Sequence, residues 1–262
     1  MSRRAKWADL APRVMTAAVL LAIGLAEVWA GGWVFALGIL ALCGLMIWEL
    51  SRMLAPGAEG RALGLAVLGV LALGLGWLLP GLMALPLIGA AAIGGAGRFA
   101  RDKWIFGLGC AAILLGAHVL WGLREEAGLA WLLWIISLVI LSDIAGYFAG
   151  KTFGGPKFWP AISPNKTWSG TIAGWIGAAL VGLAFGYSTE AGFGLVIVSV
   201  LIAMAGQMGD IAESAIKRRV GVKDSSELLP GHGGVLDRFD AMLGAALATG
   251  LLWGLGLIPG IA

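Results

Sequence analysis

Charged residues are scarce in this chain of 262 residues, and histidine and cysteine are scarcer still. Asp, Glu, Lys and Arg together make up 13% of the sequence, and there are two histidines and two cysteines. Apolar residues make up 60%, and the mean hydropathy is +0.92. A soluble domain of 27.0 kDa could not bury so much apolar surface. The composition therefore excludes a soluble globular protein and predicts an integral membrane protein.

The two cysteines, Cys43 and Cys110, both lie inside apolar runs. Two such residues argue against a disulfide framework and against a zinc site built on thiolates. We expect both to be small, apolar packing residues.

The apolar runs are long and continuous, which favours helices over the short alternating segments of a transmembrane β-barrel. A hydrocarbon core of about 30 Å needs about 20 residues per helical span. The 43 glycines and 13 tryptophans fit this class, because small residues let helices approach closely and Trp anchors at membrane interfaces. We predict nine spans, at residues 14–30, 32–54, 62–79, 82–97, 104–121, 129–149, 168–187, 192–211 and 240–258.

The basic residues test this count. With the N-terminus in the cytoplasm and nine alternating spans, Arg124 is the one basic residue of 18 that falls on the outer side. This positive-inside pattern predicts an all-α polytopic membrane protein with a cytoplasmic N-terminus and the C-terminus on the outer side. It also explains the sequence pI of about 9.1 without nucleic acid as a partner. We read the first apolar run as an uncleaved span and not as a signal peptide.

We expect residues 1–262 to form a single integral membrane domain, with N-terminal helices in 1–125 and the part that carries the chemistry in 126–262. Two connections on the inner side are long, 150–167 and 212–239, and the outer connections are short. Residues 210–240 hold five Lys or Arg and six Asp or Glu, a third of the charged residues of the chain. Polar chemistry is therefore expected at the cytoplasmic face.

Three carboxylates in this stretch have helical spacings. Asp210, Ser214 and Lys217 are spaced i, i+4 and i+7 at the end of one span, and Asp237 and Asp240 are spaced i and i+3 at the start of the next. Asp210, Asp237 and Asp240 could thus meet at the boundary between membrane and cytosol. Sites made only of oxygen ligands suit Mg²⁺.

Basic residues accompany these carboxylates. Lys217, Arg218 and Lys223 would hold anionic oxygens, and His232 opens a Gly-Gly turn that lets the backbone approach a ligand. Together the groups favour metal-assisted phosphoryl or nucleotidyl transfer. The alternative is a solvated inner loop with chance ion pairs, which we favour less for the whole cluster.

Two further polar segments are candidates. Asp143 lies within the sixth span, where a carboxylate is costly and is a functional candidate by default; a structural pair with Lys151 is the alternative. Ser163 or Thr167 could cap the seventh span, with Pro164 in its first turn.

The positive end of that seventh helix, together with Lys166, would then bind an anion, although a well-capped membrane helix without a ligand is the alternative. Glu49 and Arg52, spaced i and i+3, read as a local ion pair.

The polar segments resemble those of the phosphatidate cytidylyltransferase (CDP-diacylglycerol synthase) family. The resemblance is carried by Ser214-Ala-Ile-Lys-Arg218, Lys223-Asp224, His232-Gly-Gly234 and Asp237-Arg-Phe-Asp240. The segments beginning at Ser142-Asp143 and at Ser163-Pro164 are similar to two other segments of the family. Asn165 and Ser169 depart from it, since Lys and Glu are common there. Before residue 142 the resemblance is only compositional.

The resemblance implies that CTP and phosphatidic acid react to CDP-diacylglycerol and pyrophosphate with Mg²⁺, a second cation being left open. It implies an enzyme of the bacterial-type inner membrane whose active site faces the cytoplasm. Its expected partners are CTP, phosphatidic acid and membrane lipids, with a homodimer left open. The catalytic residues expected are Asp210, Lys217, Asp237 and Asp240, and the metal ligands are Asp210, Asp237 and Asp240. The substrate-binding residues expected are Asp143, Ser163, Lys166, Thr167, Ser214, Arg218, Lys223, Asp224 and His232.

Two other classes of function stay open. A related CTP-dependent enzyme acting on another lipid acceptor would share the metal site and differ in its apolar groove. An ion-coupled transporter would use Asp143 and Asp210 as ion sites, but it would be expected to show inverted repeats and polar residues near the midplane, which the sequence does not display.

Overall fold

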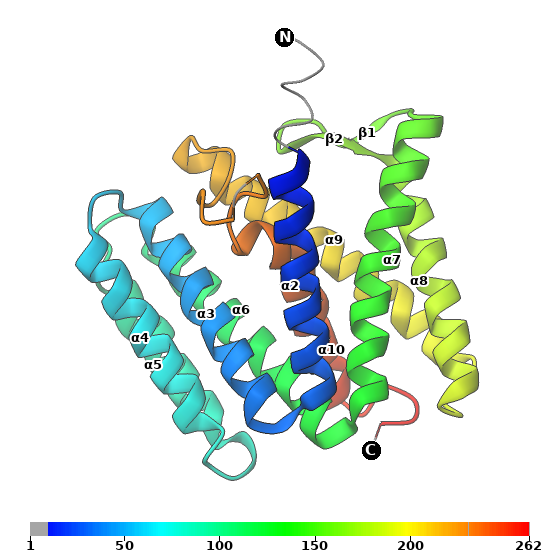
Figure 1. Cartoon of the computed structure of the whole chain (residues 1–262), viewed down its shortest axis with the longest axis horizontal. Helices are drawn as coiled ribbons and strands as arrows, with labels where there is room; N and C mark the ends of the chain where they lie inside the picture. The colour runs from blue at the N-terminus through cyan, green and yellow to red at the C-terminus, as the bar shows by residue number, and fades with distance from the viewer. Residues whose placement is uncertain (1–9, 230, 262) are drawn as a thin grey trace. The chain divides into compact units, whose positions relative to one another are not determined.

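The computed structural model describes residues 10–229 and 231–261, and its elements are nearly all helices (Figure 1). In chain order they are α2 (Leu10–Ala30), α3 (Gly32–Leu54), α4 (Glu59–Gly76), the short 3₁₀-helix η1 (Gly81–Met83), α5 (Ala84–Ala96), α6 (Lys103–Gly122), the π-helical turn η2 (Leu123–Ala127), α7 (Leu129–Phe153), β1 (Lys157–Trp159), β2 (Ser163–Thr167), α8 (Trp168–Ser188), α9 (Gly194–Val220) and α10 (Leu236–Gly254).

Each of the nine predicted apolar segments overlaps one of these α-helices. Among the described residues, six helical stretches are long and apolar enough to cross a membrane: Gly32–Leu54, Glu59–Gly76, Lys103–Ala127, Leu129–Phe153, Trp168–Ser188 and Gly194–Val220. A mainly helical chain with six candidate spans agrees with the predicted all-α polytopic membrane protein, while the count of nine spans and the sides of the termini stay predictions. The basic residues Arg3, Arg4 and Lys6 of the charge pattern lie outside the described residues.

Two helices run further than predicted. α7 continues to Phe153 and α9 to Val220, where the sequence predicted ends at residues 149 and 211. The last turn of α9 contains three cationic side chains, Lys217–Arg219, which interact favourably with the negative end of the helix dipole and so stabilise this longer helix. Because α9 ends at Val220 and α10 begins at Leu236, the connection predicted at residues 212–239 is shorter and covers residues 221–235.

Two compact units divide the chain. Unit 1 comprises residues 1–114 and 220–238, and unit 2 comprises residues 115–219 and 239–262. The connection between α9 and α10, which carries most of the motif at residues 223–237, therefore packs with the N-terminal helices. This grouping was not predicted from the sequence.

Unit 1 is a set of packed helices in which α3 contacts α4 and α4 contacts α5. Gly31 lies between α2 and α3. Its φ of 63° belongs to a region that residues with a side chain rarely adopt, which explains a glycine at this break. Ile47, Leu73 and Phe106 are fully buried, and Cys43 and Cys110 are free and buried, as predicted.

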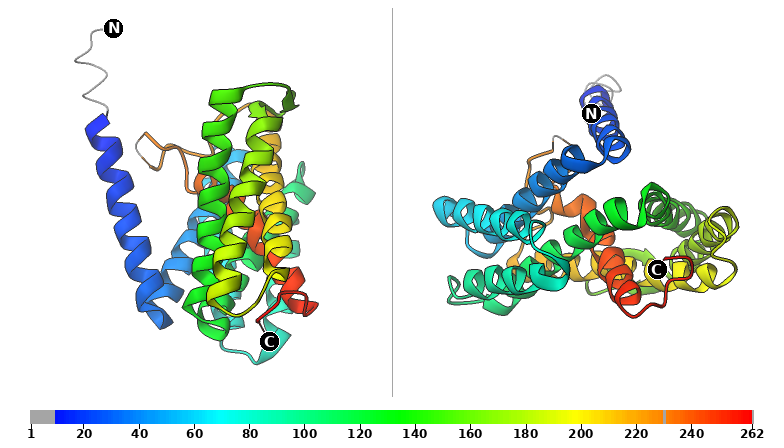
Figure 2. Two further views of the ribbon diagram at one scale, coloured as in Figure 1. Left: turned by 90° about the vertical axis from the view of Figure 1, so that its right-hand side faces the viewer. Right: turned by 90° about the horizontal axis from the view of Figure 1, so that it is seen from below.

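In unit 2, α7 and α8 lie side by side and are joined at one end by the antiparallel β1–β2 hairpin (Figures 1 and 2). Glycine permits this close packing. A Cβ atom on Gly170 would lie 2.6 Å from the Gly146 carbonyl oxygen, and one on Gly177 would lie 3.1 Å from that of Leu141. Absence of side chains thus lets the two backbones meet, as is usual for helices in membranes.

Helices α9 and α10 approach each other in the same way. A Cβ atom on Gly209 would overlap the carbonyl oxygen of Asp240, and one on Gly244 would overlap that of Ala205. Asp210 follows Gly209 directly, so this contact brings the segments that carry Asp210 and Asp240 together.

Candidate active site

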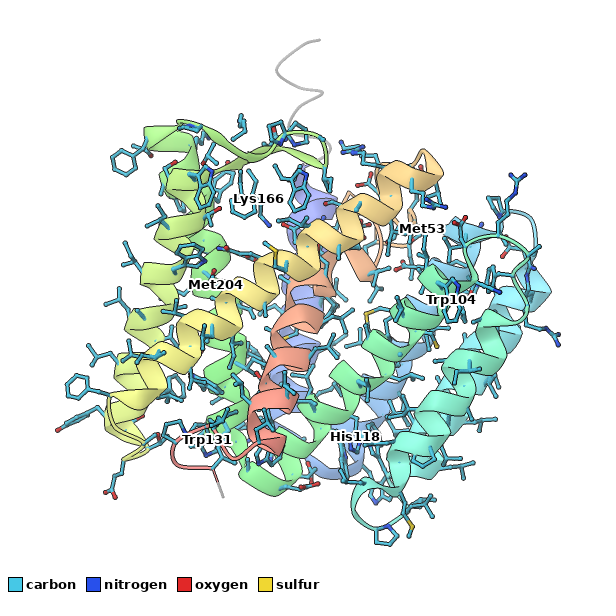
Figure 3. All side chains as sticks on the ribbon, turned by 180° about the vertical axis from the view of Figure 1, so that it is seen from behind. Met53, Trp104, His118, Trp131, Lys166 and Met204 are labelled. Carbon is cyan, nitrogen blue, oxygen red and sulfur yellow. The ribbon has the colours of Figure 1, made fainter. Side chains whose placement is uncertain are left out.

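Lys166 and Asp210 form an ion pair between β2 and α9. The Lys166 Nζ atom lies 2.6 Å from Asp210 Oδ2 and 3.2 Å from the Gln207 carbonyl oxygen, and both side chains are partly buried. Figure 3 labels Lys166, whose side chain extends from the hairpin toward α9. From the sequence, Lys166 was expected to bind an anionic ligand at a helix end. In the structure its partner is the carboxylate of Asp210 in the same chain.

Thr167 is the N-cap residue of helix α8. Its hydroxyl accepts a hydrogen bond from Gly170 N at 3.2 Å, so the predicted cap is confirmed for Thr167. The prediction that Pro164 lies in the first turn of the helix was wrong. Ser163–Thr167 forms strand β2, which pairs with β1, and the helix starts at Trp168. Ser169, at a position where Glu is common in the family that the sequence resembles, donates from its hydroxyl to the Gly154 carbonyl oxygen at 2.5 Å. This bond connects the two ends of the hairpin.

Gln207 connects α8 with α9. Its side-chain Oε1 accepts from Trp175 Nε1 at 3.0 Å, and its Nε2 donates to the Thr171 carbonyl at 3.3 Å. The backbone oxygen of the same residue accepts from Lys166. Gln207 lies one turn before Asp210, so these bonds hold the carboxylate-bearing turn of α9 in place.

Three carboxylates of unit 2 gather around this turn. Asp143 on α7 and Asp240 on α10 each interact electrostatically with Asp210, and Asp143 interacts with Asp240. A crevice of about 10 Å³, with room for about one water molecule, lies beside Asp143 and is also lined by Gln207 and Ala241, the neighbours of this turn and of Asp240. The sequence predicted that Asp210, Asp237 and Asp240 would meet. The structure brings Asp210 and Asp240 together and adds Asp143, whereas Asp237 belongs to unit 1.

Ser214 and Lys217 follow Asp210 along α9. Ser214 Oγ donates to Asp210 Oδ1 at 3.3 Å, as their i, i+4 spacing predicted. Lys217 forms an ion pair with Glu213, which is buried. Lys217 also acts electrostatically on Asp240, so it belongs to the charge cluster while its nearest partner is a carboxylate.

Asp237 is part of unit 1, where its carboxylate accepts hydrogen bonds from the connection between α9 and α10, called the motif loop below. Its Oδ2 atom accepts from Ser225 N at 2.8 Å, Ser225 Oγ at 2.9 Å and Gly234 N at 2.8 Å. The bond to Gly234, three residues earlier, reaches back across the start of α10 as in a capping box. Hydrogen bonds to one oxygen thus orient a carboxylate that the sequence proposed as a metal ligand.

Glu49 is a site residue that the sequence reasoning missed. Its side chain is fully buried and accepts from Ser226 Oγ, Val235 N, Leu236 N and Ser225 Oγ. The predicted pair between Glu49 and Arg52 was wrong, since Arg52 Nε instead lies 3.0 Å from Glu59 Oε1. A polar residue inside an apolar span was the available signal.

The remaining motif residues lie at the surface of their units. Arg218, Lys223 and Asp224 are exposed, and the His232 carbonyl accepts from Arg238 Nε at 2.9 Å and Nη2 at 2.6 Å. Ser163 lies in β2, four residues before the cap. The exposed residues remain available to a ligand from the solvent side.

The donor chemistry of the unit 2 cluster fits a hard cation. Asp143, Asp210 and Asp240 offer only oxygen, which Mg²⁺ prefers, and their mutual repulsion favours a positive charge among them. Within the described ranges, no three His, Cys, Asp or Glu side chains are arranged as a ready metal-binding group. Because Lys166 already pairs with Asp210, a cation would have to share that carboxylate with it.

Apolar helices of membrane-spanning length, with carboxylates and a lysine gathered beside a helix-capping turn, define an integral membrane protein with a polar site. Residues 11–253 match the model of the cytidylyltransferase family. The chain therefore belongs to the cytidylyltransferase family and is a nucleotidyltransferase enzyme. This assignment disfavours the ion-coupled transporter.

Proteins named phosphatidate cytidylyltransferase are among its relatives. The one from Brucella suis is 37% identical over 253 residues, which are 91% of this chain and 91% of the relative. The one from Helicobacter pylori strain 26695 is 42% identical over 135 residues, 51% of this chain and 50% of the relative. The one from Staphylococcus aureus is 44% identical over 123 residues, 46% of this chain and 47% of the relative.

Proposed function

We propose that this protein is a phosphatidate cytidylyltransferase, which joins CTP and phosphatidic acid into CDP-diacylglycerol and releases pyrophosphate. The observation that carries the proposal is the similarity to relatives of that name over 91% of the chain. The carboxylates and basic residues of the site support it, because they suit a reaction between two phosphate-bearing substrates.

In the proposed reaction, a phosphate oxygen of phosphatidic acid attacks the α-phosphorus of CTP. A bond forms between that oxygen and the α-phosphorus, and the bond between the α-phosphorus and the oxygen leading to the β-phosphorus breaks. Pyrophosphate leaves with the electron pair. The phosphate monoester is already ionised at neutral pH, so no strong general base is required.

The chain's own residues would bind and orient the phosphates. Lys166 and Lys217, each now paired with a carboxylate, would exchange part of that pairing for phosphate oxygens. Arg218 and Lys223 are exposed and would hold the triphosphate from the solvent side. Ser163 and Thr167 would position CTP near the start of α8.

We propose Mg²⁺ as the cofactor, with Asp210 and Asp240 as ligands in unit 2 and Asp237 as a ligand inferred from its place in the motif. Asp143 is proposed as a further ligand or as a polar neighbour. When bound, Mg²⁺ would neutralise charge on the triphosphate and on the leaving pyrophosphate.

The lipid substrate and the nucleotide set the place of the reaction. Phosphatidic acid lies in the membrane and CTP in the cytosol, so the site is proposed at the cytoplasmic interface of the bacterial inner membrane. The basic residues on the inner connections support this orientation.

The test uses the purified full chain in detergent with phosphatidic acid, radiolabelled CTP and Mg²⁺. Formation of a labelled CDP-lipid supports the proposal. A second arm offers a polyprenol and an ether-linked isoprenoid phosphate at the same concentration. Product with one of these and none with phosphatidic acid would instead identify the related enzyme with another lipid acceptor.

A further inference from the structure

Helix α3 is apolar along most of its length, yet it contains Glu49 with no exposed surface. A carboxylate in such a helix is costly unless its oxygens accept hydrogen bonds. Both oxygens of Glu49 do so, and every donor comes from a segment more than 170 residues later in the sequence. An acidic side chain at this depth therefore serves the motif loop and not its own helix.

The donors to Glu49 are the groups that the start of α10 leaves unsatisfied. Val235 N lies 2.9 Å from Oε1 and Leu236 N lies 2.7 Å from Oε2, and α10 begins at Leu236. The first N–H groups of a helix have no partner within the helix, and a carboxylate there also interacts favourably with the helix dipole. Glu49 thus caps α10 from another helix of unit 1.

Two serine hydroxyls complete the contact. Ser226 Oγ donates to Glu49 Oε1 at 2.6 Å, and Ser225 Oγ lies 3.2 Å from Glu49 Oε2 and 2.9 Å from Asp237 Oδ2. A single hydroxyl hydrogen can serve one of the two carboxylates at a time. Ser225 therefore couples the position of Asp237 to that of Glu49.

The space around this network is full. A Cβ atom on Gly234 would lie 2.5 Å from Glu49 Oε1 and would overlap the Ser225 hydroxyl. The second glycine of the His232-Gly-Gly turn is thus required because the buried carboxylate of α3 occupies the place of a side chain. The motif and an N-terminal helix outside it are built as one arrangement.

We propose that Glu49 is a positioning residue of the active site, which holds Ser225, Ser226 and the start of α10 on α3 and through Ser225 orients the Asp237 carboxylate. The inference rests on the proposed function for its effect on catalysis, whereas the holding of the loop does not. Residues in the first half of the chain, where the motif is absent, then contribute directly to the geometry of the motif.

The test compares Glu49→Gln with Glu59→Gln, a control of the same chemistry at an exposed ion pair of the same unit. Glutamine keeps the size of the side chain, but its amide nitrogen cannot accept from a backbone N–H. We expect kcat to fall about 10–100-fold in Glu49→Gln with the KM for CTP nearly unchanged, as for residues that orient catalytic groups. Glu59→Gln should behave as wild type.

Hydrogen exchange separates positioning from folding. Peptides covering residues 225–236 should exchange faster in Glu49→Gln than in wild type, while peptides from α7 and α8 stay protected. An unchanged kcat, unchanged exchange in residues 225–236, or a loss of activity that only matches the loss of folded protein would overturn the proposal. A wild-type protein without product would refute the proposed function and leave the exchange result as a separate test.

Ser225→Ala and Ser226→Ala provide a second comparison that does not alter the buried carboxylate. Each removes one hydroxyl that contacts Glu49, but Ser225 alone of the two also contacts Asp237. We expect the larger fall in kcat for Ser225→Ala. Equal effects of the two changes would exclude the coupling through Ser225.

Discussion

The amino group of Lys166 lies 2.6 Å from the carboxylate of Asp210, and this pair joins the β1–β2 hairpin to helix α9. Asp143 and Asp240 act on the same carboxylate. The hairpin therefore supplies a positive charge to a cluster of three negative ones. Any movement of the hairpin would change the charge that the cluster presents to a substrate.

Replacement of Lys166 by Met should lower kcat/KM by about tenfold or more, because Asp210 loses the group that fixes and neutralises it. Lys157→Met, on the exposed side of the same hairpin, is the control and should retain activity. In thermal unfolding, the double variant Lys166→Met/Asp210→Asn should be more stable than Lys166→Met alone, since it leaves no unpaired carboxylate. A double variant less stable than the single one would contradict this account.

Asp240→Asn should abolish CDP-lipid formation, and EDTA should do the same to wild type until excess Mg²⁺ is added. The physical reason is that Asn carries no negative charge and has one oxygen instead of two, so the cluster that contains Asp210 would hold a cation less well. Glu190→Gln, in the connection between α8 and α9, removes an exposed carboxylate of the same unit as a control. Radiolabelled product that persists in EDTA would refute the metal requirement.

Gly244→Ala should destabilise the protein by about 1–3 kcal/mol and reduce kcat strongly, because the added methyl group meets the Ala205 backbone. Separation of α9 and α10 would also move Asp210 away from Asp240. Gly254→Ala lies on the same helix with open space before its Cβ position and should be neutral. Equal thermal midpoints and activities for the two variants would show that the helices do not depend on this contact.

Thr167→Ala should lower the free energy of unfolding by about 1 kcal/mol, because the Gly170 N–H at the start of α8 loses its partner. Thr167→Ser retains the hydroxyl and should recover most of this loss. The measurement is thermal unfolding in detergent. An alanine variant as stable as the serine variant would mean that the cap contributes nothing there.

The helices could be predicted closely because the lengths of apolar runs and the glycines between them set their positions. The predicted span 32–54 coincides with α3, and Thr167 was one of two cap candidates, with Ser163, chosen for their chemistry. Asp210 with Ser214 followed from helical spacing alone. These features depend on residues that are near one another in the sequence.

The errors came from partners that are distant in sequence. Glu49 was paired with Arg52 three residues away, although its partners lie 176 to 187 residues further on. Pro164 was placed in a helix because the pairing of β2 with β1 cannot be read from a five-residue polar segment. The pairing of Lys166 with Asp210 was not foreseen, because this carboxylate on α9 is 44 residues away in the sequence.

The indole N–H of Trp175 donates a hydrogen bond to Gln207 Oε1 at 3.0 Å, so this indole group can serve as a spectroscopic probe of Gln207. Gln207 also accepts from Lys166 through its carbonyl oxygen, so the indole proton of Trp175 is two hydrogen bonds from the Lys166 side chain. In a sample with ¹⁵N-labelled tryptophan, that indole resonance, assigned with Trp175→Phe, should shift when Lys166 changes partner. Occupation of the charge cluster could then be followed in solution without any turnover of substrate.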